Sequence, residues 1–224
     1  MTSLRPPARL APRVVPSVDP WVAGEMFVSP HVEERRRGLA ILFGSETVRR
    51  SPLTAQLLAA RVDEPDLALR SQIVQALADY FEVRGSDYRY PSEIRSLAAA
   101  HLRRYDRPQI QALLEVHVAA REGAVRLAPD SLSRLLARIP NASLVLVRLA
   151  GERGLAVRLR RAAVELIGRV GFTDALQALE GLEARIAGRR AGQMAMAFAP
   201  TDHADEQSLL PALQQTLLAL RENE

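Results

Sequence analysis

Apolar residues recur at intervals of three and four along most of the chain, the spacing that places them on one face of an α-helix. In the segment 67–82 the apolar face consists of Leu69, Ile73, Ala76, Leu77 and Tyr80. The polar face of the same segment carries Gln72, Gln75, Asp79 and Glu82. No alternating apolar–polar stretch and no Asn-Gly hairpin signal stands out. The pattern therefore predicts an all-α fold.

Start and stop signals divide this pattern into about nine or ten helices. Ser29-Pro30 and Ser51-Pro52 combine an N-cap residue with proline at the first helical position, and Gly44 ends the first of these two helices. Asp19-Pro20 gives the same signal before 21–27, where we expect a short turn that covers the end of the array. Further helices are expected within 65–83, 93–105, 108–123, 129–139, 142–154, 155–188 (a pair) and 208–223.

The same pattern divides the chain into four parts. Residues 1–18 are rich in Pro and Arg and are expected to be disordered or extended. Residues 19–189 form the predicted helical repeat domain. Residues 190–205 are expected to be a flexible connector, and 206–222 a C-terminal capping helix.

Three segments of the repeat domain share a template. The stretch "RRRGLAILFG" at 35–44 aligns with "LRRAAVELIG" at 159–168, with coinciding apolar positions. "LRSQIVQALAD" at 69–79 fits the same template when Leu69 takes the position of Glu34 and Leu159. The separations, 35 and 90 residues, suit one and two units of a helical repeat with insertions.

The stretch "LRRAAVELIGRVGFTDALQALEGL" at 159–182 resembles a HEAT repeat, and 29–83 resembles the family less closely. The resemblance implies a right-handed α-α superhelix in which each two-helix unit covers the apolar side of its neighbour. It also implies a ladder of Asp–Arg pairs, with Asp66 near Arg70. Counting helices from either end gives conflicting pairings near 129–153, so the number of helices there stays open.

Composition limits the classes of function. Apolar residues make up 48% of the chain but aromatic residues only 4%, so aliphatic side chains must fill the core. The absence of cysteine excludes disulfides, thiolate metal sites and a cysteine nucleophile. No apolar run approaches the roughly 18 residues that a membrane span needs, and no secretion signal is recognised at the start. These features predict a cytoplasmic protein that does not bind membranes.

The charge balance is less basic than the isoelectric point suggests. All 30 basic side chains are arginine, and 26 acidic residues reduce the net charge to +4. The isoelectric point of about 10.2 reflects the lack of lysine rather than a dense positive field.

No motif for catalysis stands out, so we expect a non-enzymatic protein without a cofactor or metal. The four histidines, His31, His101, His117 and His203, show no HExxH or His-x-His spacing. His101 and His117 fall within helical patterns and are expected to be partly buried. His203 lies in an acidic stretch, "DHADE", that we interpret as a solvated linker.

One local charge cluster remains. Between Arg134 and Arg161 seven arginines face a single acid, Glu152, a local excess of six positive charges. The candidate partner-binding residues in this region are Arg134, Arg138, Arg148, Arg158, Arg160 and Arg161. A solvated face, an acidic protein partner and nucleic-acid phosphate all fit such a cluster. The lack of aromatic residues for base stacking favours the first two.

The leading hypothesis is therefore a scaffold that binds a protein partner on an elongated helical surface. The alternative is a nucleic-acid-binding protein similar to the alkylation-repair DNA glycosylases that are built from HEAT-like repeats. A third interpretation, kinship with bilin lyases, rests on the repeats alone. Oligomeric state is not indicated by the sequence.

Overall fold

The computed structural model describes residues 19–44, 46–84, 87–194 and 207–222. The predicted disorder of 1–18 and most of the predicted connector, 195–205, lie outside these residues. Within them most residues are helical, which confirms the all-α class. No helix in the described part of the chain combines the length and apolarity required to cross a membrane.

Twelve α-helices are present in the described residues. The N-terminal half contains α1 (Pro20–Phe27), α2 (Val32–Gly44), α3 (Glu46–Arg49), α4 (Pro52–Ala60), α5 (Leu67–Asp79) and α6 (Ser92–Leu102). The C-terminal half contains α7 (Arg107–Arg121), α8 (Ser131–Leu136), α9 (Ala142–Gly151), α10 (Val157–Val170), α11 (Leu176–Met194) and α13 (Leu210–Arg221). A short 3₁₀ helix, η1 (Thr173–Ala175), precedes α11.

Four details differ from the sequence-based expectation, and one is the four-residue helix α3, which no predicted helix covers. Residues 20–27 form a full helix rather than a turn, because the Asp19 side chain accepts a hydrogen bond from the Trp21 N–H at 2.9 Å. The backbone of α11 continues to Met194, so the expected connector begins later than 190. A short antiparallel hairpin of two-residue strands, β1 (Val83–Arg84) with β2 (Asp87–Tyr88), lies between α5 and α6.

Helix boundaries follow from local chemistry. The Asp66 side chain accepts from the Leu69 N–H at 2.9 Å and starts α5. Asp106 and Gln109 form a capping box that starts α7. Gly171 ends α10 with φ of +80°, a left-handed conformation that glycine adopts at little cost.

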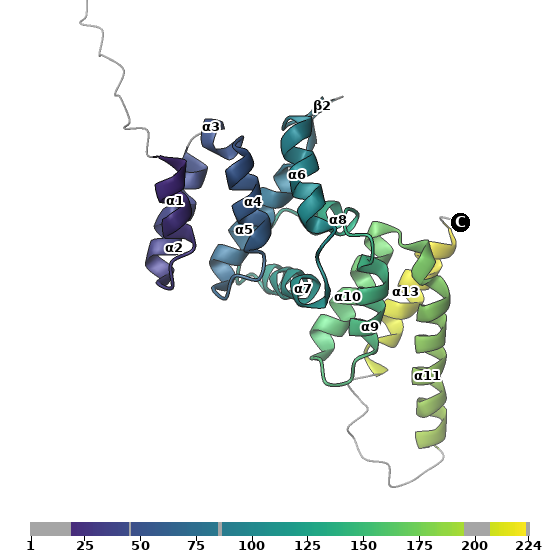
Figure 1. Ribbon diagram of the computed structural model, residues 1–224. Coiled ribbons are helices and arrows are strands. Elements are labelled where there is room, and N and C mark those ends of the chain that lie inside the picture. Colours follow the sequence, from purple (N-terminus) through teal and green to yellow (C-terminus); the bar gives the residue numbers. More distant parts are fainter. Residues whose placement is uncertain (1–18, 45, 85–86, 195–206, 223–224) are drawn as a thin grey trace, which may run out of the picture.

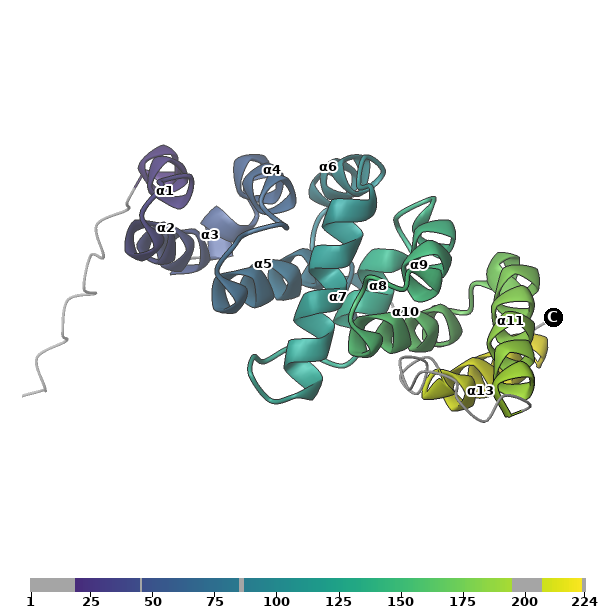
Figure 2. The same ribbon diagram turned by 90° about the horizontal axis from the view of Figure 1, so that it is seen from below.

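The helices succeed one another along an elongated array, from α1 at one end to α11 and α13 at the other (Figure 1). Figure 2 shows α1, α4 and α6 in one row, with α2 and α5 in a second row beneath them. The same two-row arrangement continues with α9 above α10. Between α5 and α10 the second row holds both α7 and α8, which pack against both neighbours. The middle of the array therefore has one helix more than a simple succession of pairs.

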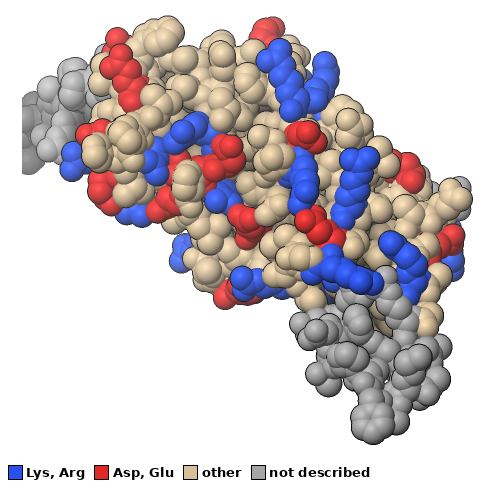
Figure 3. All heavy atoms as spheres, turned by 60° about the horizontal axis from the view of Figure 1, so that its bottom comes forward, with Lys and Arg blue, Asp and Glu red and all other residues tan. Residues whose placement is uncertain are grey.

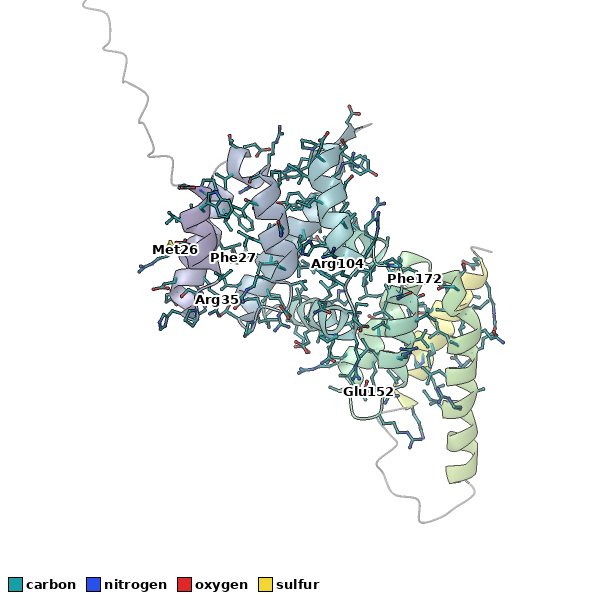
Figure 4. All side chains as sticks on the ribbon, in the orientation of Figure 1. Met26, Phe27, Arg35, Arg104, Glu152 and Phe172 are labelled. Atoms are coloured by element: carbon teal, nitrogen blue, oxygen red, sulfur yellow. The ribbon has the colours of Figure 1, made fainter. Side chains whose placement is uncertain are left out.

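Aliphatic side chains form one continuous core between the rows, as the composition predicts. Close backbone approach is possible where the side chains are small. A Cβ on Gly38 would lie 2.5 Å from the Phe27 amide nitrogen and 2.7 Å from the Ala23 carbonyl oxygen. Gly38 thus lets α1 cross α2 in direct contact and brings Phe27, labelled in Figure 4, into full burial.

Three buried arginines correspond when Glu34, Leu69 and Leu159 are aligned, a register one residue away from the match of 35–44 with 159–168. Arg35, Arg70 and Arg160 each follow the aligned residue Glu34, Leu69 or Leu159. Each donates to a carbonyl oxygen of the segment before its own helix: Arg35 to Pro30 at 2.8 Å, Arg70 to Glu64 at 2.6 Å, and Arg160 to Ala150 at 2.9 Å. These arginines therefore fix the entry of the chain into each helix.

A series of Arg–carboxylate pairs, which we call the arginine ladder, links helices to other helices or to the turns beside them along the array. The two partners of each pair lie between 29 and 45 positions apart in the sequence. The ladder consists of Arg35–Glu64, Arg36–Asp66, Arg70–Glu115, Arg107–Glu152, Arg121–Glu165, Arg158–Glu122 and Arg221–Glu180. Asp66 and Arg70, expected to pair with each other, instead contact Arg36 and Glu115, because both side chains extend toward neighbouring units.

Candidate functional site

The structure separates the six arginines of the predicted cluster. Arg134 lies on α8 and Arg138 lies two residues after its end. Arg148 is exposed on α9. Arg158 and Arg161 on α10 are exposed and pair with Glu122 and Glu165. The predicted cluster is therefore spread over three helices, and two of its exposed members are already paired.

Arg160 does not belong to a partner-binding surface. Its side chain is 2% exposed and its Nε donates to the Ala150 carbonyl oxygen, which corrects the sequence-based assignment. The sequence did contain a signal for this burial. Arg160 precedes Ala163, Val164 and Ile167 by three, four and seven residues, which places it on the apolar stripe of α10.

Arg134 and Arg138 open onto a groove of about 670 Å³, which we call the arginine groove. One wall comes from α8, and another from the end of α5 with the β1–β2 hairpin. The third wall is the C-terminal end of α10. The lining residues are Phe81, Glu82, Val83, Tyr88, Asp130, Ser133, Arg134, Ala137, Arg138, Arg169 and Val170.

Packing of α8 creates this groove. Leu132, Leu135 and Leu136 are buried against the core, so the opposite side of α8 turns Arg134 and Arg138 outward. The Gln75 side chain of α5 fixes the start of α8 by accepting from the Ala128 N–H at 2.8 Å and the Ser131 hydroxyl at 3.0 Å. Because α8 also contacts α10, Arg169 comes to the same groove.

The arginine groove is lined by three arginines and two acids, Glu82 and Asp130, so its net charge is positive. Among the described residues, no carboxylate lies within 4 Å of the guanidinium nitrogens of Arg134, Arg138 or Arg169. Arg138 stacks over the Phe81 ring at 5.5 Å, and Arg169 donates to the Pro129 carbonyl oxygen at 3.3 Å. These contacts hold the guanidinium groups in place without removing their charge.

Arg169 was not among the predicted site residues. It lies beyond the sequence window that defined the cluster, and only the packing of α8 on α10 brings it near Arg134. No local sequence signal indicates that approach. Of the three groove arginines, only Arg134 and Arg138 are predicted from the sequence.

A neighbouring hollow of about 660 Å³ lies between α7, α10 and α13 and shares Arg169 with the arginine groove. His117 lines this hollow and is 6% exposed. Burial, together with the charges of Arg169 and Arg121, lowers the pKa of His117 to about 4. The imidazole is therefore neutral at pH 7 and adds no positive charge here.

The described residues contain no group of three or more His, Asp or Glu side chains arranged to hold a metal ion. His203 and the acidic residues beside it lie outside the described residues. His31 is exposed and His101 is half-buried on α6. The geometry therefore directs attention to the arginine groove rather than to a metal centre.

Comparison with known proteins gives no match for this chain: no family model, no curated protein and no solved structure is similar to it.

Proposed function

We propose that this protein is a non-enzymatic interaction scaffold, built as a HEAT-like right-handed superhelix, whose arginine groove binds an acidic segment of a partner protein. The elongated two-row array and the links between its units support the scaffold class. The observation that carries the choice of partner is the set of three arginines, Arg134, Arg138 and Arg169, around one groove.

The composition of the groove favours a protein segment that is both acidic and apolar. Guanidinium groups bind carboxylates through charge-assisted, bidentate hydrogen bonds. Beside them, Val83 is 54% exposed and Tyr88 is 39% exposed, and both line the same groove. A segment with glutamates or aspartates next to leucine or phenylalanine would satisfy both kinds of wall.

A nucleic-acid duplex is a less suitable partner, because acidic side chains lie among the arginines on the surface of the molecule. Figure 3 shows red acidic side chains among the blue arginines on the face it displays. Several arginines of the described residues already pair with carboxylates, as Arg121 and Arg161 do with Glu165. A phosphate backbone laid along this face would meet acidic groups, whose repulsion opposes binding.

The test is an affinity capture with the full chain, followed by anisotropy with a labelled acidic–apolar peptide and with a labelled DNA duplex. The double variant Arg134→Glu/Arg138→Glu should weaken peptide binding by at least about tenfold, because each lost charged hydrogen bond is worth roughly 1.5–3 kcal/mol. The control, Arg37→Glu/Arg185→Glu, reverses two exposed arginines on α2 and α11 and should bind like the wild type.

Equal weakening by both double variants would show that net charge, and not the groove, determines binding. Tight duplex binding whose logarithm falls with log salt at a slope near about −5 would favour the nucleic-acid alternative. Partners recovered with the wild type and the control, but not with the groove variant, would support the proposal.

A further inference from the structure

A second pocket, which we call the aromatic pocket, lies beside the C-terminal half of α5. Its volume is about 300 Å³. It shares no lining residue with the arginine groove. The lining residues are Phe43, Arg49, Gln72, Gln75, Ala76, Asp79, Tyr80, Tyr90 and Arg126.

Three rings form the apolar part of the aromatic pocket, and their positions are fixed. The Tyr80 and Tyr90 rings meet edge to face with centroids 4.9 Å apart. The Tyr80 hydroxyl donates to the Arg49 carbonyl oxygen at 3.2 Å, and burial raises the pKa of Tyr80, so this hydroxyl stays protonated. Phe43 lies under the Arg49 guanidinium group, 5.5 Å from ring centroid to carbon Cζ.

Two arginines supply positive charge to the same pocket. Arg49 is held by its Nε, which donates to the Phe43 carbonyl oxygen at 2.9 Å, so its terminal nitrogens remain available. Arg126 is exposed and follows α7 on the loop whose Ala128 N–H is held by Gln75. Among the described residues, neither guanidinium group has a carboxylate within 4 Å.

One acid limits the charge that the pocket accepts. Asp79 lines it and accepts from the Gln75 side-chain amide at 2.7 Å. Arg89 lies 3.8 Å from the other Asp79 oxygen and neutralises only part of its charge. Two free arginines beside this carboxylate favour a ligand with a single negative charge over a dianion, which Asp79 would repel.

From these contacts we infer that the aromatic pocket binds a small aromatic monocarboxylate. A cavity of about 150 Å³ holds one benzene ring, so 300 Å³ accommodates a ring with one carboxylate attached. The ring packs against Phe43 and the tyrosine pair, and the carboxylate accepts hydrogen bonds from Arg49 and Arg126. This inference does not depend on the proposed partner of the arginine groove.

The experiment uses benzoate as the probe, with the full chain and ligand-observed NMR or calorimetry as the readout. Acetate carries the charge without the ring, and benzamide carries the ring without the charge. Benzoate should bind more tightly than either compound. Arg126→Gln should weaken benzoate binding about tenfold, the effect of one lost charge-assisted hydrogen bond, and should leave benzamide unchanged.

Arg185→Gln is the matched control, because this exposed arginine lies on α11, away from the pocket. It should bind benzoate as the wild type does. The inference is overturned if acetate or benzamide binds as well as benzoate, if Arg126→Gln has no effect, or if benzoate binding does not saturate.

Discussion

A buried guanidinium group needs acceptors for its hydrogens, and Arg35 has them. Its Nε and Nη2 donate to the Glu64 carboxylate, and its Nη1 donates to the carbonyl oxygens of Ser29 and Pro30. At the residue scale, the template arginines therefore serve the fold before they serve any partner. Helical spacing marks Arg160 as one of them, whereas it leaves the neighbouring Arg161 in solvent.

His117 gives a prediction at the same scale. Its pKa is about 4 in the folded chain against 6.5 for the unperturbed side chain, so the unfolded state binds a proton first as the pH falls. Stability should therefore be lost between pH 6.5 and 4, by up to roughly 3 kcal/mol in total. Urea unfolding at several pH values should show this loss in the wild type and a smaller loss in His117→Gln.

The matched control for that titration is His31→Gln, because the His31 side chain is exposed. It should follow the wild type at every pH. The assignment to His117 fails if His117→Gln and the wild type lose stability in parallel over this range.

At the scale of elements, the sequence predicted helix positions well because the signals are local. Proline and acidic N-caps start α1, α5 and α7, and Gly171 ends α10, as their residue types indicate. The contact between α1 and α2 is different, since it depends on the absence of a side chain at Gly38. Nothing in the sequence around Gly38 distinguishes it from other helical glycines.

Gly38→Ala should destabilise the chain by about 2 kcal/mol, because the added Cβ meets the backbone of α1. This loss exceeds the roughly 1 kcal/mol gained from the higher helix propensity of alanine. Urea unfolding measures the effect. Relative to the wild type, amide hydrogen exchange in the variant should accelerate more in α1 and α2 than in α10. Gly44→Ala is the control, since a Cβ there has no heavy atom within 4 Å. Equal stability of the two variants would contradict the prediction.

The arginine ladder gives a second prediction about elements. Burial alone raises the pKa of Glu64, but the bonds from Arg35 and the Asp66 N–H, with the charges of Arg35 and Arg61, lower it on balance. Glu64→Gln should therefore cost about 3 kcal/mol at neutral pH, because Arg35 stays buried without its counter-charge. The stabilisation from Glu64 should be lost as the pH falls below 4.5, the ordinary pKa of a glutamate. Urea unfolding of the wild type and Glu64→Gln at neutral pH and below pH 4.5 measures this loss.

Glu33→Gln provides the contrast, since Glu33 pairs with Arg36 at an exposed position. Its cost should stay below about 1 kcal/mol. If both substitutions cost the same, the buried pair has no special part in joining α2 to the turn before α5.

At the scale of the whole molecule, the all-α class follows from apolar periodicity, but the arginine groove does not. The groove depends on α8, which packs against both α5 and α10, and on the β1–β2 hairpin, whose two-residue strands are too short to leave an alternating pattern. Such contacts between distant segments are not encoded in local spacing. For this reason the sequence identified Arg134 and Arg138 but not Arg169.

The ladder that joins the units contains arginine as its only cation. A lysine ammonium group loses its proton near pH 10.4, whereas a guanidinium group keeps its proton above about pH 12. The links between units should therefore survive alkaline solution in which lysine-based pairs would fail. Amine-directed cross-linkers have no lysine side chain to attack anywhere in this sequence, so mapping its contacts calls for reagents that couple to the carboxylates instead.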